Sequence, residues 1–448
     1  MSLDSITRRH FFYGSLLAGA VPAAGFGSTP SLKHLGYKSP NEKLNVAAIG
    51  AGGKGDSDIA ACALTENIVA MADPDSKRAA RMFKRFPSVP KYKDFRLMLD
   101  KEGKNIDAVT VSCPDHMHGT AAMWAIERGK HVYCQKPLTR TVWEARQLTE
   151  AARKYKVASQ MGNQGYSNDG TRQCAEILWS GDIGNVTEVH AWTNRPVWPQ
   201  GPEVIPVEAP VPATLDWDIW LGLAASRPYS PSYLPHNWRG FPDFGCGAIG
   251  DMACHIMGAP NMALRLTAPT SVECIQQEGK GKYTYPKKSV LRYEFPARGS
   301  MPPVTVYWHD GGLLPPRPKG IPEDEVLGDR GRNGSLFIGD KGIMTTGEYG
   351  GNTRLLPASK MQDYKFPPPL LTRSPGHARD WIRACKGGER SCSDFRVAGP
   401  FTEWMLLGVL ALRFEGKLLW DPQKLRITNN AEANKRIKPQ FRKGWKFV

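Results

Sequence analysis

Lys136, Asp251 and His255 are side chains whose types and positions suit proton transfer. Lys136 follows the short apolar run 131–134, and Asp251 and His255 stand four positions apart in a later segment. An ammonium at the end of a buried parallel strand lies where such sheets bind ligands, and it can polarise a substrate oxygen while hydride moves at the adjoining carbon. On a helix, Asp251 and His255 would share one face, where a carboxylate beside an imidazole helps it to accept a hydroxyl proton. The alternatives are a surface lysine and a helix N-terminal aspartate near a structural histidine.

A glycine-rich turn near the N-terminus predicts a dinucleotide site. Gly50-Ala51-Gly52-Gly53-Lys54-Gly55 has the spacing G-x-G-x-x-G and follows the apolar run 44–49. The first glycine permits a tight turn, the second lets a pyrophosphate approach the backbone, and the third lets helix and strand pack closely. The phosphates would then face a helix N-terminus.

Asp73 predicts which nicotinamide cofactor binds. It ends a second apolar run, 68–72, and can accept hydrogen bonds from the adenosine ribose hydroxyls. Because its carboxylate would repel a 2′-phosphate, we expect NAD rather than NADP. Lys77 and Arg78, just beyond it, offer the alternative of holding that phosphate.

The first forty residues predict an export signal. Arg8 and Arg9 precede two phenylalanines and the uncharged run 13–26, which is rich in Ala, Leu and Gly. This run is too short to span a membrane permanently. We expect export by the twin-arginine machinery to the periplasm, or otherwise outside the cytoplasm, and this route would let the chain fold around NAD before crossing. The alternative is a chance arginine pair before an apolar helix.

Composition describes a globular chain. Its 448 residues are 41% hydrophobic and 23% charged, which suggests two or three domains at about 150 residues each. No uncharged apolar stretch in the body is long enough for a spanning helix, so we do not expect an integral membrane protein. The nine cysteines contain no C-x-x-C pair and predict free thiols. Cys113, His116 and His118 crowd together, but without a second ligand cluster we predict no metal site.

The net charge of +16 lies partly in the last residues, 435–446. No nucleic-acid motif accompanies this charge, so we expect no nucleic-acid partner. Acidic glycans or anionic envelope surfaces are alternative partners, and a solvated basic face is the simpler interpretation.

The order of the elements predicts an α/β fold with four segments. These are a leader and spacer (1–40), an NAD-binding Rossmann domain with a doubly wound parallel sheet (41–165), an α+β domain with a large, mainly antiparallel sheet for substrate binding and oligomerisation (166–430), and a basic tail (431–448). The segment 196–243 is too long for a plain connector and predicts a functional loop. The predicted strands are 44–49, 68–72, 106–111, 131–134, 157–161, 186–194, 271–277, 290–295, 304–309 and 335–338; the main predicted helices are 55–64, 75–86, 118–127, 141–155, 249–264, 377–385 and 401–414.

Four motifs together resemble the glucose-fructose oxidoreductase and inositol dehydrogenase family, Gfo/Idh/MocA. They are the glycine turn, the loop 112–118 (SCPDHMH), the segment 129–137 (GKHVYCQKP) and the Asp251/His255 pair. The family usually has Glu before the lysine, where this chain has Gln135. Within the family, the segments 236–240, 243–245 and 250–252 and the closing Gly444-Trp445 are similar to twin-arginine-exported members, including glycoside hydrolase family 109.

The resemblance implies roles for individual residues. Lys136 and His255 would handle protons, Asp251 would orient them, and Tyr166, His236 and Arg239 would contact the substrate. The cofactor would lie against the glycine turn, Asp73 and the residues Ser112, Cys113, Pro114, His118, Gln135, Lys136, Asn163 and Trp238.

The function predicted in this way is that of an NAD-dependent oxidoreductase acting on a sugar or glycoside, and we expect a homo-oligomer. A tightly bound NAD recycled in each turn would make the net reaction glycoside cleavage, with Tyr166 or His236 as the base at C2. One alternative is a plain sugar or polyol dehydrogenase. Another is an exported sugar-binding protein with a vestigial nucleotide fold.

Overall fold

The computed structural model describes residues 42–447, and the chain from Lys43 onward forms one compact unit. The predicted export signal, with Arg8 and Arg9, lies outside the described residues. No helix within residues 42–447 combines the length and apolar character that a membrane span requires.

The first sheet contains six parallel strands in the order β3-β2-β1-β4-β5-β6. Its strands consist mostly of apolar residues, because helices cover both faces of the sheet and bury both sides of most strands. The strand order reverses between β1 and β4, which is where open α/β sheets bind their ligands. The strands are β1 (Asn45–Ile49), β2 (Asn67–Ala72), β3 (Lys91–Tyr92), β4 (Ala108–Val111), β5 (His131–Cys134) and β6 (Ser159–Met161); the helices are α2 (Lys54–Cys62), α3 (Ser76–Arg85), α4 (Phe95–Glu102), α5 (Asp115–Glu127) and α6 (Val142–Lys154).

The second sheet contains nine strands in the order β13-β12-β11-β7-β10-β9-β8-β14-β15. Strands β7 and β10 pair in parallel and the other pairs are antiparallel, so the predicted α/β fold with a mainly antiparallel second sheet is confirmed. The strands are β7 (Val186–Trp192), β8 (Ser271–Glu278), β9 (Lys288–Phe295), β10 (Val304–His309), β11 (Gly334–Gly339), β12 (Ile343–Thr346), β13 (Arg354–Leu356), β14 (Leu418–Asp421) and β15 (Arg426–Ile427).

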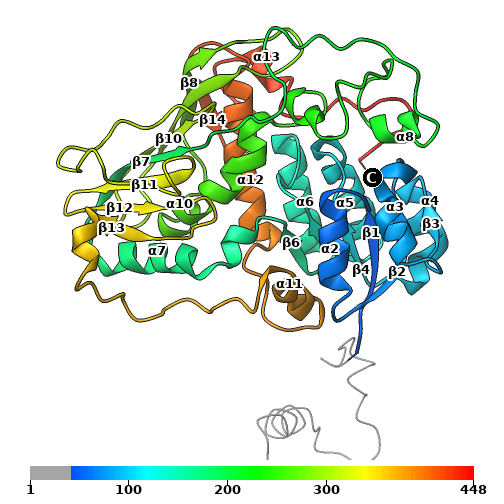
Figure 1. Cartoon of the computed structure of the whole chain (residues 1–448), viewed down its shortest axis with the longest axis horizontal. Helices are drawn as coiled ribbons and strands as arrows, with labels where there is room; N and C mark the ends of the chain where they lie inside the picture. Colours follow the sequence, from blue (N-terminus) through cyan, green and yellow to red (C-terminus); the bar gives the residue numbers. More distant parts are fainter. Residues whose placement is uncertain (1–41, 448) are drawn as a thin grey trace, which may run out of the picture. The chain divides into compact units, whose positions relative to one another are not determined.

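Helix α12 (Phe395–Ala411) joins the two sheets. It is almost wholly buried and contacts both α6 and β8, as Figure 1 shows. One apolar core therefore runs from Val109 in the first sheet to Phe337 in the second. The remaining helices of this half are α7 (Asp169–Ser180), α8 (Trp217–Leu221), α9 (Cys254–Ile256), α10 (Gly258–Ala263), α11 (His377–Cys385) and α13 (Ala431–Asn434).

Several predicted boundaries were wrong. Helix α7 was not predicted, and α5 begins at Asp115 rather than at 118. The predicted helix 249–264 is instead a π-helical turn, Ile249–Ala253, followed by the separate short helices α9 and α10.

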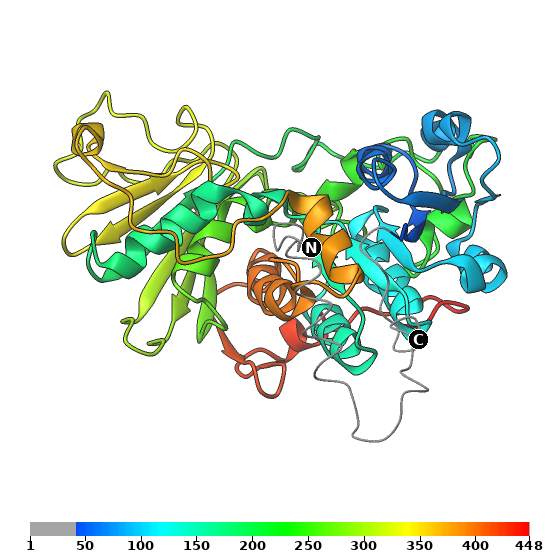
Figure 2. The same ribbon diagram turned by 90° about the horizontal axis from the view of Figure 1, so that it is seen from below.

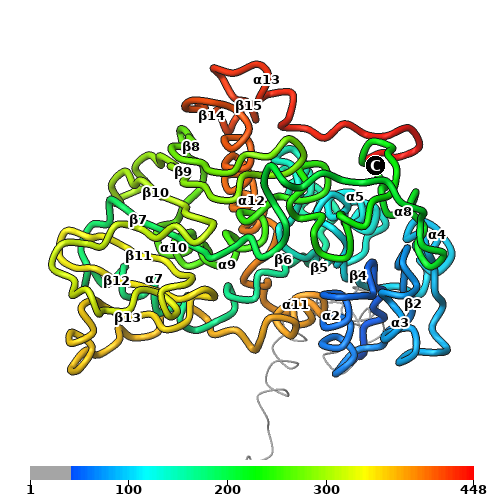
Figure 3. Tube along the Cα trace, turned by 45° about the horizontal axis from the view of Figure 1, so that its top comes forward, coloured from blue at the N-terminus to red at the C-terminus, as the bar shows by residue number. Residues whose placement is uncertain are grey.

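The predicted loop 196–243 crosses from the second sheet to the first. Figure 3 shows this green segment running from β7 to α8, which lies close to α4. Its Asp216 N–H donates to the Pro74 carbonyl at 2.8 Å, and Ser76 N–H donates to the Thr214 carbonyl at 3.0 Å. The crossing segment therefore attaches directly to the turn that follows β2.

The basic C-terminal segment also packs on the first half of the chain (Figures 1 and 2). The Trp445 ring lies 6.2 Å from the Phe95 ring and 3.9 Å from the Arg96 guanidinium. Arg442 N–H donates to the Leu223 carbonyl at 3.1 Å. Apolar side chains thus anchor a segment whose charge alone predicts a solvated face.

Candidate active site

The glycine turn has the geometry that its spacing predicts. Gly50 has a φ of +86°, and a Cβ there would lie 2.6 Å from the Ser112 carbonyl oxygen. A Cβ on Gly55 would lie 2.0 Å from the Gly50 carbonyl oxygen, so this glycine lets α2 pack against β1. A Cβ on Gly52 would meet the backbone of Arg78 at 2.6 Å, and this glycine therefore also serves packing against α3. Gly53 and Lys54 at the start of α2 line the cavity described below, and a helix N-terminus favours a bound phosphate.

Asp73 holds the turn in place. One carboxylate oxygen accepts from the N–H groups of Ala51 and Gly52 at 2.8 and 3.1 Å, and the other accepts from Asp75 N–H at 2.9 Å. Burial raises the pKa of this carboxyl despite these hydrogen bonds. Asp73 and Arg78 also line the cavity described next.

A single cavity of about 540 Å³ joins the glycine turn to the predicted proton-handling residues. The crossing segment contributes Ile219, Trp220 and Leu234 to its wall, so this segment forms part of the candidate site. The predicted site residues that line the cavity are Gly50, Gly52, Gly53, Lys54, Asp73, Ser112, Cys113, Pro114, His118, Gln135, Lys136, His236, Trp238, Arg239, Asp251 and His255.

Asn163 and Tyr166 do not line this cavity. Asn163 is fully buried and accepts a hydrogen bond from Ser393. The Tyr166 hydroxyl accepts from the Asn261 amide at 2.7 Å, and burial raises the pKa of the phenol far above neutrality. The predictions of a cofactor contact for Asn163 and of a base for Tyr166 do not agree with this placement, because both side chains support the interior behind the site. Ala51 and Gly55 likewise shape the turn from behind its surface.

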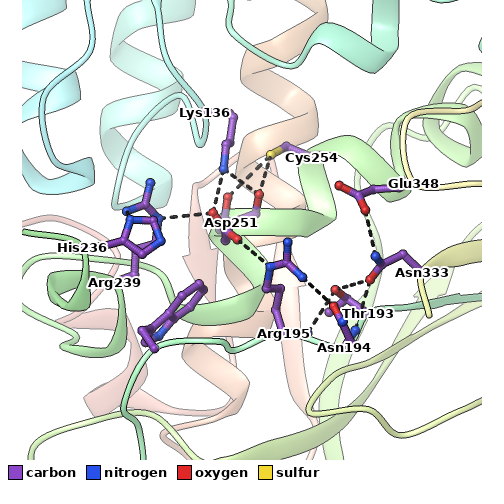
Figure 4. A network of polar contacts seen from close by, with 12 residues as sticks. Lys136, Thr193, Asn194, Arg195, His236, Arg239, Asp251, Cys254, Asn333 and Glu348 are labelled. Atoms are coloured by element: carbon purple, nitrogen blue, oxygen red, sulfur yellow. Dashed lines mark hydrogen bonds and ion pairs between the residues drawn. The ribbon is translucent and has the colours of Figure 1, made fainter. Parts of the chain in front are cut away.

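Lys136 and Asp251 form the centre of the site. The Lys136 ammonium donates to both the carboxylate and the backbone carbonyl of Asp251, each at 2.8 Å (Figure 4). Arg239 Nε donates to the same carboxylate oxygen at 3.2 Å. Although burial acts in the opposite direction, Lys136 and Arg239 hold the pKa of Asp251 well below its usual range. The carboxylate therefore stays ionised and fixes the ammonium.

Asp251 and His255 both line the cavity and interact electrostatically, but Lys136 and not His255 is the hydrogen-bond partner of the carboxylate. Asp251 lies in a π-helical turn, whose wider winding does not align residues four apart as an α-helix does. Its carboxylate faces Lys136, and His255 Nδ1 is buried without a hydrogen-bond partner among residues 42–447. Burial, aided by Lys136, lowers the pKa of His255 well below its ordinary value. His255 is thus a neutral imidazole in the cavity wall, able to accept a proton.

Three further groups set the charge around this centre. Burial and Arg239 lower the pKa of His236 to about 4, and Arg239 donates to its Nδ1 at 2.8 Å. Burial raises the pKa of Asp115 to about 7, although Arg239 and Lys136 act against it. Arg195, whose Nε lies 3.8 Å from Asp251, was not predicted. It follows β7 far from every motif in the sequence, so only the folded chain shows its position.

Two family models match the chain. The model for the oxidoreductase family with an NAD-binding Rossmann fold matches residues 44–163, and that for the family's C-terminal alpha/beta domain matches residues 182–289. The chain belongs to the Gfo/Idh/MocA oxidoreductase family. The prediction of an NAD-binding Rossmann domain is thereby confirmed. The glycine turn and Asp73, which this kind of domain uses to bind the cofactor, line one part of the cavity.

Curated Gfo/Idh/MocA-type relatives include sugar and polyol dehydrogenases. Levoglucosan dehydrogenase of Pseudarthrobacter phenanthrenivorans is 24% identical over 48% of this chain and 50% of its own length. D-glucoside 3-dehydrogenase of Escherichia coli is 31% identical over 32% of this chain and 41% of its own. Inositol 2-dehydrogenase of Serratia proteamaculans is 30% identical over 34% and 46%. The chain spans half or less of the length of each.

Solved structures show the same fold. The WlbA dehydrogenase of Bordetella pertussis, in complex with NADH and UDP-GlcNAcA, superposes with a TM-score of 0.60 at 16% identity and covers 85% of this chain and 99% of its own. Levoglucosan dehydrogenase in complex with NADH superposes with a TM-score of 0.54 at 18% identity over 84% and 99%. At these identities the likeness establishes the fold alone.

Gln135 departs from the usual Gfo/Idh/MocA glutamate for a reason visible in its contacts. Its amide donates to Asp58 Oδ2 at 2.8 Å, and the Ser112 hydroxyl donates to the same oxygen at 2.8 Å. Asp58 also pairs with Lys54 of the glycine turn. A glutamate at 135 would place a second carboxylate against Asp58, so glutamine maintains the hydrogen bond without charge repulsion.

We expect Gln135→Glu to destabilise the protein by about 1–3 kcal/mol, because it replaces a buried donor by a like charge. Urea unfolding at pH 7 measures this change. The new carboxyl would have a raised pKa, so the loss should shrink as the pH falls through that pKa. In the double variant Asp58→Asn/Gln135→Glu the amide and carboxylate exchange places, and it should unfold at a higher urea concentration than Gln135→Glu alone. If the double variant lost as much stability as Asp58→Asn and Gln135→Glu lose together, this account of Gln135 would be wrong.

Proposed function

We propose that this protein oxidises and reduces a hydroxyl-bearing carbon of a sugar or glycoside with NAD. The main observation in support is that one cavity joins the glycine turn to the Lys136–Asp251 pair and His255. When bound, NAD supplies the acceptor and donor of hydride. The names of the curated relatives, which include levoglucosan, D-glucoside and inositol dehydrogenases, support a sugar or polyol as the substrate class.

The side chains divide the proton handling between them. The Lys136 ammonium, fixed by Asp251, can hydrogen-bond the substrate oxygen and stabilise the negative charge that grows on it. His255 is our candidate acceptor of the hydroxyl proton, since its ring lines the cavity and burial keeps it unprotonated before the reaction. Asp251 positions the lysine rather than the histidine.

The finer proposal is that the net reaction is glycoside cleavage. Oxidation at C3 acidifies the proton on C2; a base removes it and the C1 substituent leaves with the C1–O bond electrons. Water then adds its hydroxyl to C1 and a proton to C2, and reduction at C3 restores the sugar. His236 is our candidate for the base at C2 because it lines the cavity; its Nδ1 accepts from Arg239, so this contact must be given up when the ring takes the proton.

The predicted leader supports this closed cycle. We propose that the twin-arginine route exports the folded, NAD-loaded protein. Outside the cytoplasm no pool reoxidises NADH, and a cofactor carried there must be restored in each turnover. A plain dehydrogenase is the second candidate, since the named relatives are dehydrogenases. A sugar-binding protein would not need the fixed lysine.

The test uses purified protein, aryl glycosides and deuterated water without added NAD. We expect many turnovers per protein and one deuterium at C2 of the released sugar. Turnover that stops after one equivalent, with NADH absorbance appearing, would select the plain dehydrogenase. Release of a sugar without deuterium at C2 would exclude the elimination step.

A further inference from the structure

The substrate end of the cavity contains more positive than negative charge. Asp251 is approached by three cationic groups, Lys136 at 2.8 Å, Arg239 at 3.2 Å and Arg195 at 3.8 Å (Figure 4). All four side chains are largely buried, with 11% to 27% of each exposed. One carboxylate faces all three cations and its shortest contacts are to Lys136, so the cluster has two more positive charges than negative ones.

Among the described residues, no other carboxylate in the cavity wall forms an ion pair with either arginine. Asp73 and Asp75 lie at the glycine turn, where backbone N–H groups occupy them. Asp115 accepts from Cys246 N–H and forms no ion pair with either arginine within residues 42–447, although Arg239 and Lys136 act on it through space. Glu348 accepts from the Asn333 amide (Figure 4).

Both arginines are held in place and keep donors free. Arg195 Nη1 donates to Asn194 at 2.6 Å, and Arg239 Nη1 donates to His236 at 2.8 Å. The Arg239 guanidinium also lies 4.2 Å from the Trp238 ring. Within residues 42–447, neither Nη2 makes a hydrogen bond. Two anchored guanidinium groups with free N–H donors form a receptor for a planar anion with two acceptor oxygens.

We propose that the sugar oxidised in this cavity carries a carboxylate, as a hexuronic acid or its glycoside does, and that Arg195 and Arg239 bind that carboxylate. The proposal rests on the proposed function and names its substrate class. The substrate anion takes the place that a second protein carboxylate would otherwise fill, so burial of the arginines is compensated only in the complex.

The test compares sugars that differ only at C6. The NAD-loaded protein is offered methyl glucuronide against methyl glucoside and methyl galacturonide against methyl galactoside, with the corresponding 6-phosphates as a third arm. For at least one configuration we expect kcat/KM for the uronide to exceed that for the neutral sugar by about tenfold or more, as charge-assisted hydrogen bonds imply. Equal values, or a preference for neutral sugars or 6-phosphates, would overturn the carboxylate assignment.

The variant Arg195→Gln should lower kcat/KM more for the uronide than for its neutral counterpart, mainly through KM. Arg85→Gln, an exposed arginine at the end of α3, is the matched control and should change neither. An equal loss on both sugars would mean that Arg195 is only structural and would refute the proposal.

Titration calorimetry with glucuronate and galacturonate separates this proposal from the proposed function. Binding that Arg195→Gln weakens, without turnover of any sugar, would support the carboxylate site and refute the oxidoreductase cycle. Absence of both binding and turnover would refute both.

Discussion

Replacing Lys136 with methionine should lower kcat/KM by about 10³-fold, the loss expected when a principal donor to a developing oxyanion is removed. The ammonium donates to Asp251 at 2.8 Å and projects into the cavity. Methionine keeps the apolar stem but offers no proton and no charge. NAD should still bind, because the glycine turn and Asp73 are untouched, and NADH fluorescence titration measures this.

The matched control is Lys104→Met, the same substitution at an exposed lysine outside the cavity wall. It should leave activity and NADH affinity within a factor of about two, as surface substitutions usually do. If Lys136→Met kept more than a tenth of the kcat/KM, the lysine would not be the group that stabilises the substrate oxygen.

The substitution Gly55→Ala should reduce NAD affinity by about tenfold to a hundredfold, since overpacking costs about 1–3 kcal/mol and about 1.4 kcal/mol is a factor of ten. The new methyl would lie 2.0 Å from the Gly50 carbonyl oxygen, and that backbone atom can move only if the turn itself moves. Calorimetry with NAD, together with a thermal unfolding curve, distinguishes a displaced turn from an unfolded domain.

Gly103→Ala provides the control for Gly55→Ala. A Cβ at Gly103 would meet nothing within 4 Å, and its φ of −53° suits any residue. Its NAD affinity and melting temperature should match those of the unsubstituted protein. Normal NAD binding by Gly55→Ala would show that the turn tolerates displacement and would contradict the packing role given to this glycine.

The cofactor half of the site could be predicted from the sequence because its determinants are local. The glycines, the apolar strand before them and Asp73 lie within thirty residues of one another, and steric limits on the backbone give them one dominant interpretation. The regular alternation of apolar strands and helices likewise predicted the parallel sheet. Even here, the hydrogen bonds that the Ala51 and Gly52 N–H groups donate to Asp73 were not predicted, since they depend on the turn already being formed.

The substrate half could be predicted only in part. Asp251 and His255 have the spacing of one helical face, but the π-helical turn redirects the carboxylate to Lys136. Nothing local marks that turn, because it depends on packing around it. Arg195 lies in the site because the chain after β7 passes close to Asp251. Tyr166 lies outside the cavity wall because its hydroxyl accepts from Asn261 in the interior. Both placements depend on contacts between residues that are distant in sequence.

The position of Trp445 has a consequence for synthesis of the chain. This residue packs against Phe95 and Arg96, so about 350 residues separate the two sides of the contact. A ribosome must synthesise those residues after α4 before α4 acquires its final neighbours. Closing such a long loop delays folding, and the nucleotide domain waits with that apolar surface uncovered. Chaperones that recognise exposed apolar segments would therefore meet this face before Trp445 covers it.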